Sequence, residues 1–202
     1  MKIAIVNTWA ISDKSIGGTE RFVVDLAESF AKLGNEVDVF MFSGISHHYN
    51  GINYININLF NISGNADEYV LPQNLGDFET DESYSELANR LEKIIPLDDY
   101  DFIQLNSFLF LECWKYKKRI FTIHTNPFEY ELAFGLKSYK KVIEKIAKLK
   151  NRNETIFVAP SRYYAEKYTN RTGCNIVFIP HAIDNNRLKI GKSKNEIIKK
   201  IR

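Results

Sequence analysis

The stretch from residue 2 to residue 42 constrains the fold most, because a strand, a glycine-containing loop, a helix and a second strand follow one another in it. The strand patterns are an apolar run at Lys2–Asn7 and a mixed apolar and polar run at Glu36–Phe42. Between them, apolar residues recur at the spacing of a helix with one buried face: Phe22, Val23, Leu26, Phe30 and Leu33. Gly34 follows, where many helices end on a left-handed residue. The stretch therefore predicts a β-α-β unit of a parallel sheet.

The loop of this unit closes on Gly17-Gly18, and Thr19 follows as the expected N-cap of the helix. Glycines let a ligand approach the backbone, and a helix N-terminus offers free N–H groups and partial positive charge. The loop therefore fits a phosphate site, although the same glycine pair also fits a plain tight turn. It matches neither the G-x-G-x-x-G pattern nor the G-K-[ST] ending of a P-loop, which argues against NAD and ATP sites.

The rest of the chain continues the alternation of strands and helices, which predicts an α/β fold with a Rossmann-like, doubly wound parallel sheet. Further strands are expected at Ile52–Ile57, Asp101–Leu105, Arg119–His124, Thr155–Ala159 and Asn175–Ile179. Further helices are expected before Pro96, from Ser107 to Lys115, over Pro127–Leu149 and from Ser161 to Thr169. Residues 43–51 are expected to form a loop and residues 58–80 an irregular segment.

The bulk properties narrow the class of protein. The 202 residues carry a net charge of +2 and are 45% hydrophobic, which is typical of a soluble globular domain. This charge gives no case for nucleic acid binding. No apolar run reaches the length of a membrane span. A strand pattern begins at residue 2, in place of a signal peptide, so we expect a cytoplasmic protein.

The chain starts M-K-I-A-I-V-N and later reads G-G-T-E-R-F-V-V-D-L-A-E-S-F-A-K-L-G-N-E-V-D-V-F. These segments resemble the N-terminus of retaining glycosyltransferases of the family 4 type, which have the GT-B fold. The resemblance implies two Rossmann-like domains that face each other across a cleft, with this chain as the N-terminal, acceptor-side domain. It also implies that Gly17 and Gly18 lie against the diphosphate of a nucleotide-sugar donor.

The segment Ile179–Asp184 reads I-P-H-A-I-D and resembles the family's I-P-[NH]-[GA]-I-D crossover between the two domains. We therefore expect residues 1–184 to form the GT-B N-terminal domain. Residues 185–202 are expected to be a linker and the start of a C-terminal, donor-binding domain. The family's basic residues that hold the diphosphate lie in that second domain, so this chain alone is expected to be inactive.

Polar residues follow several predicted strands, at the edge where open α/β sheets bind ligands. His124 matches a family histidine that faces the sugar and the acceptor, so it is the catalytic candidate, with Thr125 where the family often has Asp. Asn106, Ser161 and Arg162 follow two other strands, and we expect them to bind the acceptor or the sugar. The plainer alternatives are a histidine that is only hydrogen-bonded at a strand end and a serine that is only a helix cap.

No metal site is expected. His47 and His48 have no third ligand at a useful spacing. The run Asp98–Asp101 looks like the D-x-D box of other glycosyltransferases, but it precedes a strand and so belongs at the opposite edge of the sheet as a solvated turn. The resemblance likewise implies transfer without a metal, in which protein groups neutralise the leaving diphosphate.

Seven basic residues gather in 137–152, around an apolar stripe of Tyr139, Val142, Ile143, Ile146 and Leu149. A basic amphipathic helix can lie on an anionic membrane, and several relatives act on lipid-linked acceptors. Peripheral contact with the inner membrane face is therefore one interpretation. The other is a domain helix whose stripe packs in the core while its lysines face solvent.

These observations predict a glycosyltransferase that moves a sugar from a nucleotide sugar to an acceptor hydroxyl, such as that of a cell-surface glycan or a glycolipid. The nucleotide sugar is a co-substrate, and no cofactor is expected. Two alternatives remain open. One is a non-catalytic half-enzyme or binding module that needs a partner C-terminal subunit. The other is a Rossmann-like regulator that binds a nucleotide or a small sugar.

Overall fold

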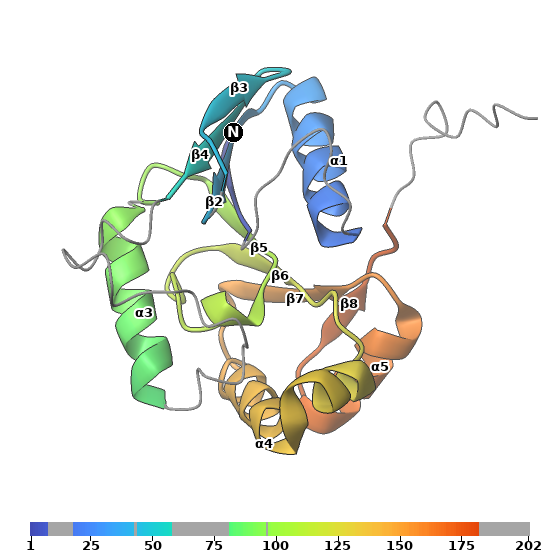
Figure 1. The fold of residues 1–202 in the computed structure, drawn as a ribbon. Coiled ribbons are helices and arrows are strands. Elements are labelled where there is room, and N and C mark those ends of the chain that lie inside the picture. Colours follow the sequence, from blue (N-terminus) through green and yellow to red (C-terminus); the bar gives the residue numbers. More distant parts are fainter. Residues whose placement is uncertain (8–17, 43, 58–80, 96, 182–202) are drawn as a thin grey trace, which may run out of the picture.

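The computed structural model describes residues 1–7, 18–42, 44–57, 81–95 and 97–181, which form a twisted sheet with helices on both faces (Figure 1). In this part of the chain the sheet has eight strands in the order β3-β4-β2-β1-β5-β6-β7-β8. They are β1 Lys2–Val6, β2 Glu36–Met41, β3 His47–Tyr49, β4 Ile52–Asn56, β5 Phe102–Leu105, β6 Arg119–Thr122, β7 Thr155–Ala159 and β8 Ile176–Phe178. All neighbours pair in parallel except β3 and β4, so the predicted doubly wound α/β sheet is confirmed.

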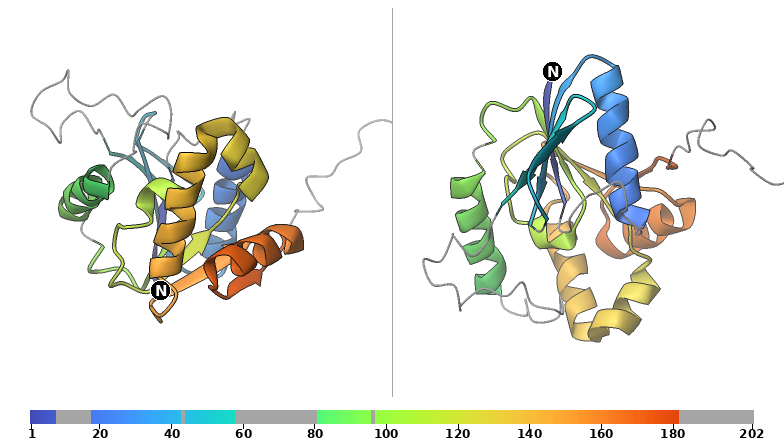
Figure 2. Two further views of the ribbon diagram at one scale, coloured as in Figure 1. Left: turned by 90° about the horizontal axis from the view of Figure 1, so that it is seen from below. Right: turned by 45° about the horizontal axis from the view of Figure 1, so that its top comes forward.

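The helices lie in two layers. α1 (Gly18–Lys32) covers one face of the sheet, and α3 (Asp81–Ile94), α4 (Pro127–Lys148) and α5 (Arg162–Thr172) lie on the other side, as Figure 2 shows. Under α1, Val23 and Ala27 pack against strand residues that include Ile3, Ile5, Val37, Val39 and Met41. On the opposite face, the three helices contribute to a larger cluster that includes Leu91, Val142, Ile146, Tyr168 and Phe121. Each such aliphatic side chain contributes about 1.5–3 kcal/mol when it leaves water.

The expected loop at residues 43–51 is wrong, because His47–Tyr49 forms strand β3 and pairs antiparallel with β4. A two-residue turn joins these strands, with Asn50 at φ 51° and Gly51 at φ 78°. Positive φ at both turn positions is the hairpin geometry that Asn-Gly favours. The sequence therefore held the signal for this hairpin, in the Asn-Gly pair itself.

The expected helix from Ser107 to Lys115 is also wrong. Only Phe108–Phe110 forms a short 3₁₀ helix, and turns follow it up to β6. The side chains of Phe108, Phe110, Leu111, Cys113 and Trp114 are all buried, which a helix with one buried face could not achieve. Trp114 has a φ of 47°, which an α-helix excludes.

β1 lies at the topological switch point of the sheet, because β2 is its neighbour on one side and β5 its neighbour on the other. Open parallel sheets bind ligands outside the carboxyl ends of the strands at such a point. Here β1 leads into Asn7, which is 1% exposed, and β5 leads into Asn106, which is 6% exposed. The side-chain Nδ2 of Asn106 donates to the carbonyl oxygen of Val6 at 3.4 Å, so Asn106 spans the switch point.

The apolar stripe of α4 packs in the core. Tyr139, Val142, Ile146 and Leu149 are buried, as the domain-helix interpretation requires. That interpretation expected the lysines to face solvent, but Lys145 is only 4% exposed. Its Nζ lies 3.4 Å from the Oε1 of Glu112. None of the helices among the described residues is long and apolar enough to cross a membrane.

Candidate functional site

His124 lies at the carboxyl edge of the sheet, just beyond β6. The amide of Ile123 still donates to the carbonyl of Val158 at 2.8 Å, so the sheet ladder continues up to the residue before His124. On the other side, the hydroxyl of Tyr168 in α5 donates to the carbonyl of Thr125 at 3.3 Å. Hydrogen bonds therefore hold the backbone on both sides of the histidine.

The side chain of His124 is held by Asn106, from the neighbouring strand end. Its Nε2 lies 3.1 Å from the Oδ1 of Asn106. Because the Nδ2 of Asn106 donates to Val6, its Oδ1 is the acceptor, and the Nε2 of His124 must carry the proton. The lone pair of His124 is then on Nδ1, which has no hydrogen-bond partner in the part of the chain that the structure describes.

A third polar side chain fixes Asn106. The Nε2 of Gln104, in β5, donates to the Oδ1 of Asn106 at 3.3 Å and to the Oγ1 of Thr122 at 2.7 Å. Gln104 and Thr122 are 3% and 4% exposed, so this network lies inside the sheet rather than in solvent. Buried and satisfied hydrogen bonds of this kind hold a side chain in one orientation.

The electrostatics keep His124 uncharged. Burial, together with the nearby His181, lowers the pKa of His124 from its ordinary 6.5 to about 3. The main cause is that an imidazolium in a poorly solvated place loses its hydration. At neutral pH, His124 is therefore a neutral imidazole with an unshared electron pair on Nδ1.

The glycine pair that was expected to bind the donor diphosphate is only partly described. Gly17 lies outside the described residues, while Gly18 is the first residue of α1. Thr19 is accordingly inside the first turn, so its expected role as N-cap is wrong. Among the described residues, a Cβ added to Gly18 would meet no atom within 4 Å, and the φ of Gly18 lies outside the left-handed range. Neither packing nor backbone conformation requires a glycine there.

Ser161 and Arg162 lie at the same edge, after β7, but apart from the His124 network. Ser161 occupies the N-cap position of α5, as expected, but its side chain makes no capping hydrogen bond. The guanidinium of Arg162 is exposed and lies 5.6 Å from the ring centre of Phe178. Among the described residues, neither side chain hydrogen-bonds to His124 or Asn106.

The sequence did not single out Gln104, Phe22 or His181 as site residues. Gln104 carried a signal, since it is a polar residue inside an apolar strand. His181 stood in the I-P-H-A-I-D segment but was read only as a domain marker, and Phe22 only as part of the buried face of a helix. Gln104 acts on His124 through Asn106, while the ring centroids of Phe22 and His181 lie 4.9 Å and 5.4 Å from that of His124. These neighbours depend on the strand order, which local sequence patterns do not reveal.

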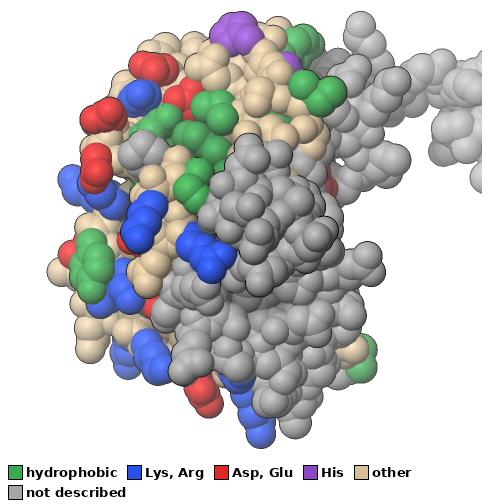
Figure 3. Space-filling view, turned by 60° about the vertical axis from the view of Figure 1, so that its left-hand side comes forward, with side chains coloured by type: hydrophobic (Ala, Val, Ile, Leu, Met, Phe, Trp, Pro, Cys, Tyr) green, Lys and Arg blue, Asp and Glu red, His purple; other side chains and the backbone are tan. Residues whose placement is uncertain are grey.

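The other polar candidates have structural roles at distant places. His47 stacks on Tyr54, and the Nδ1 of His48 lies 2.8 Å from the Oδ1 of Asn53. Asp98 pairs with Lys117, and Asp101 accepts from the backbone of Lys2, which agrees with a turn at the amino edge. No group of three or more metal-ligating side chains occurs in the described ranges. On the surface seen in Figure 3, positive and negative side chains are interspersed.

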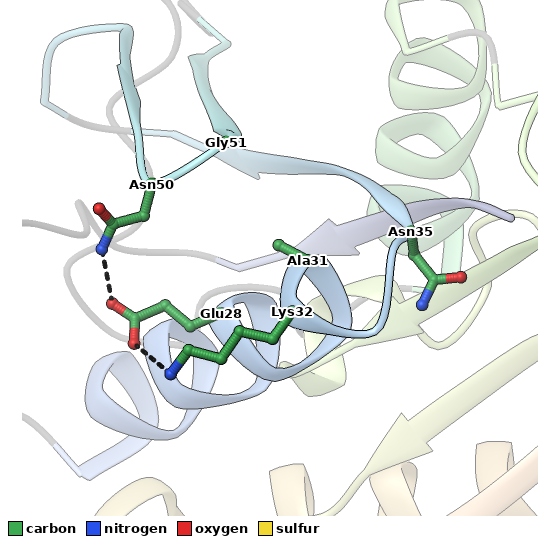
Figure 4. Close-up of a pocket in the computed structure, with 6 residues that line it drawn as sticks. All are labelled: Glu28, Ala31, Lys32, Asn35, Asn50 and Gly51. Atoms are coloured by element: carbon green, nitrogen blue, oxygen red, sulfur yellow. Dashed lines mark hydrogen bonds and ion pairs between the residues drawn. The ribbon is translucent and has the colours of Figure 1, made fainter.

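A depression of about 420 Å³ lies at the far end of α1, against the β3–β4 turn (Figure 4). It is lined by Glu28, Ala31, Lys32, Asn35, Asn50 and Gly51. Its buried carboxylate, that of Glu28, accepts from the amide of Asn50 at 3.3 Å and lies 3.9 Å from the Nζ of Lys32. Because Glu28, Lys32, Asn35 and Asn50 in the depression already have hydrogen-bond or ion-pair partners, we place the candidate site at the carboxyl edge instead.

Comparison with known proteins finds one matching family and several similar structures. The model of glycosyltransferase family 4 matches residues 16–187. Sucrose-phosphate synthase from Thermosynechococcus elongatus superposes with a TM-score of 0.59 at 16% identity, over 89% of this chain and 47% of that one. The lipopolysaccharide glycosyltransferase WaaG gives a TM-score of 0.59 at 13% identity, over 98% of this chain and 50% of that one.

A glycosyltransferase from Rickettsia africae gives a TM-score of 0.54 at 15% identity, over 99% of this chain and 48% of that one. At such low identities, these similarities establish the fold. This chain spans about half the length of each of these three proteins. No curated protein matches it.

Proposed function

The chain belongs to glycosyltransferase family 4, and from this we propose that it is the acceptor-side domain of an enzyme that transfers a sugar from a nucleotide sugar to an acceptor hydroxyl. Its sheet has the architecture of the N-terminal half of the GT-B fold. The observation that carries the proposal is His124, a neutral imidazole with a free Nδ1 at the carboxyl edge where such sheets bind ligands.

His124 has the central role in the proposal. Its Nδ1 accepts a hydrogen bond from a hydroxyl of the donor sugar or the acceptor, which orients that substrate for transfer. Asn106 is buried, and its Oδ1 is already engaged by Gln104 and His124. Its role is accordingly to hold His124 rather than to contact the acceptor directly.

Gly18 supports the donor side of the proposal. As the first residue of α1, it brings backbone N–H groups and the positive end of the helix dipole to the carboxyl edge. The open space around it lets a diphosphate come close to the backbone, and Gly17 would extend the same loop. Ser161 and Arg162, one strand further along the edge, would bind the acceptor, a glycan or a lipid-linked sugar.

The remaining steps rest on the family. We propose a retaining transfer without a metal, in a cleft that a second, donor-binding domain closes. Stabilisation of a leaving diphosphate needs preorganised positive groups on both sides of such a cleft. Because this chain is half the length of the proteins that it resembles, the activity would need that second domain, with the chain acting alone only as a binding module.

The proposal is tested by measuring sugar transfer by the protein when it is joined to its second domain or partner subunit. The assay uses a panel of nucleotide sugars, with and without EDTA. His124→Gln should lose most of the transfer, and Gly18→Ala should raise the KM for the nucleotide sugar. His48→Gln, in the β3–β4 hairpin, is the matched control and should keep full activity. If the His124→Gln variant keeps full sugar transfer, the carboxyl edge of the sheet is not the substrate site, and the proposal is refuted. Tight nucleotide-sugar binding by this chain without any transfer would favour the regulator alternative.

A further inference from the structure

Phe22 packs against two histidines that come from distant parts of the chain. Its ring centroid lies 4.9 Å from that of His124, in an edge-to-face contact, and 4.2 Å from that of His181, which stacks on it. The two imidazole centroids are 5.4 Å apart, so the three rings form a triangle. The second turn of α1, the end of β6 and the segment after β8 thus meet at one point of the carboxyl edge.

Both imidazoles keep hydrogen-bonding capacity in this arrangement. His124 uses Nε2 toward Asn106 and leaves Nδ1 available. His181 is exposed, and neither of its ring nitrogens bonds to another described residue. The triangle therefore presents hydrogen-bonding atoms of two different side chains at the place where the proposed substrates would bind.

The packing also favours the uncharged form of both rings. The loss of solvent on the stacked side of the ring lowers the pKa of His181, as burial lowers that of His124. A neutral imidazole has one N–H and one lone pair, so it can donate to one hydroxyl group and accept from another. Two imidazolium ions would only donate, and they would repel each other.

We infer that Phe22 is a positioning residue that holds His124 and His181 side by side, and that His181 is a second hydrogen-bonding contact for a sugar hydroxyl at this edge. The inference rests on the proposed function, because it names the sugar of the substrate as the ligand of the histidine pair. Two adjacent neutral imidazoles suit neighbouring hydroxyl groups of one sugar, whereas a phosphate favours charged donors.

A metal ion is the other ligand that paired imidazoles suggest. Structural and catalytic zinc sites use at least three protein ligands. In the described part of the chain, no third histidine, cysteine or carboxylate joins the pair. The hydroxyl-bearing ligand therefore fits the triangle better than an ion does.

Nitrogen-15 NMR of the histidine rings tests the positioning. The chain has four histidines, and His47 and His48 in the hairpin serve as internal controls. Phe22→Leu should raise the pKa of His124 and weaken the signature of its protonated Nε2, while Phe22→Tyr should preserve both. Neither change should move the signals of the hairpin histidines. If the pKa and the Nε2 signal of His124 are unchanged in Phe22→Leu, Phe22 is not a positioning residue.

Kinetics of sugar transfer test the second contact. His181→Phe keeps a stacked ring but removes the hydrogen bonds, so the KM for one sugar substrate should rise about threefold to tenfold. His124 should keep its low pKa in this variant. Unchanged KM values for both substrates would overturn the role of His181. If transfer instead survives in His124→Gln, the proposed function of the edge fails, while the NMR result on Phe22 still stands.

Discussion

The Nε2 of His124 lies 3.1 Å from the Oδ1 of Asn106, so Asn106, directly after β5, determines the tautomer of His124, two residues beyond β6. The amide of Asn106 is itself oriented by the carbonyl of Val6, at the end of β1. Three neighbouring strand ends therefore act together on one imidazole.

Asn106→Asp should raise the pKa of His124. A carboxylate at hydrogen-bond distance favours the imidazolium, by roughly 1–3 pKa units. Histidine NMR titration measures the change. His47 and His48, in the hairpin, are internal controls whose signals should not change in this variant. An unchanged titration of His124 in Asn106→Asp would contradict the hydrogen bond to Asn106.

The stability of the fold should fall in mild acid. His124 is neutral when folded, with a pKa of about 3, but binds a proton near its ordinary pKa of 6.5 when unfolded. Between these values the unfolded state binds more protons, so the free energy of unfolding falls as the pH falls. The loss from this group is at most about 1.4 kcal/mol per pH unit.

Urea unfolding at a series of pH values measures this dependence. His124→Gln removes the titrating group, so its stability should decrease less steeply than that of the native chain below pH 6.5. His48→Gln, which changes an exposed histidine, should keep the native pH dependence. Parallel curves for His124→Gln and the native chain would show that His124 is not held neutral.

Two glycine variants should have opposite effects on stability. Gly51→Ala places a side chain at a φ of +78°, which costs about 1–2 kcal/mol. Gly18→Ala meets no atom within 4 Å and lies in a helix, where alanine is the better former, so stability should be kept or rise. Chemical denaturation separates the two cases. An equal loss in both variants would mean that Gly18 is a structural glycine after all.

Tyr100→Phe should destabilise the sheet. Asp38 is 5% exposed in β2, and its carboxylate accepts from the Nδ2 of Asn53 at 2.7 Å and from the hydroxyl of Tyr100. Without that hydroxyl, one buried oxygen loses its donor, which lowers the free energy of unfolding by about 1–3 kcal/mol. Tyr116→Phe is the control, since this tyrosine is 73% exposed. Similar midpoints for both variants would contradict a stabilising role of the Tyr100 bond.

Local patterns predicted most of the fold. Runs such as Lys2–Val6 and the helical spacing over residues 20–33 are properties of adjacent residues, and both elements form as expected. The two wrong elements have physical causes. The hairpin at His47–Tyr49 was missed because its strand is short and exposed, although Asn50-Gly51 marked the turn. In the segment after Ser107, the side chains of Phe108, Phe110, Leu111, Cys113 and Trp114 are all buried, and no helical period describes that spacing.

The sequence by itself determined the α/β class, the β-α-β unit around Gly18 and the position of His124 at a strand end, since these follow from spacing along the chain. Only the tertiary structure decided that Asn106 is buried and hydrogen-bonded to His124, and that the rings of Phe22 and His181 lie against His124. The reason is that strand order is set by packing over the whole sheet. Residues more than a hundred positions apart, such as Phe22 and His181, become neighbours only when every strand has found its place.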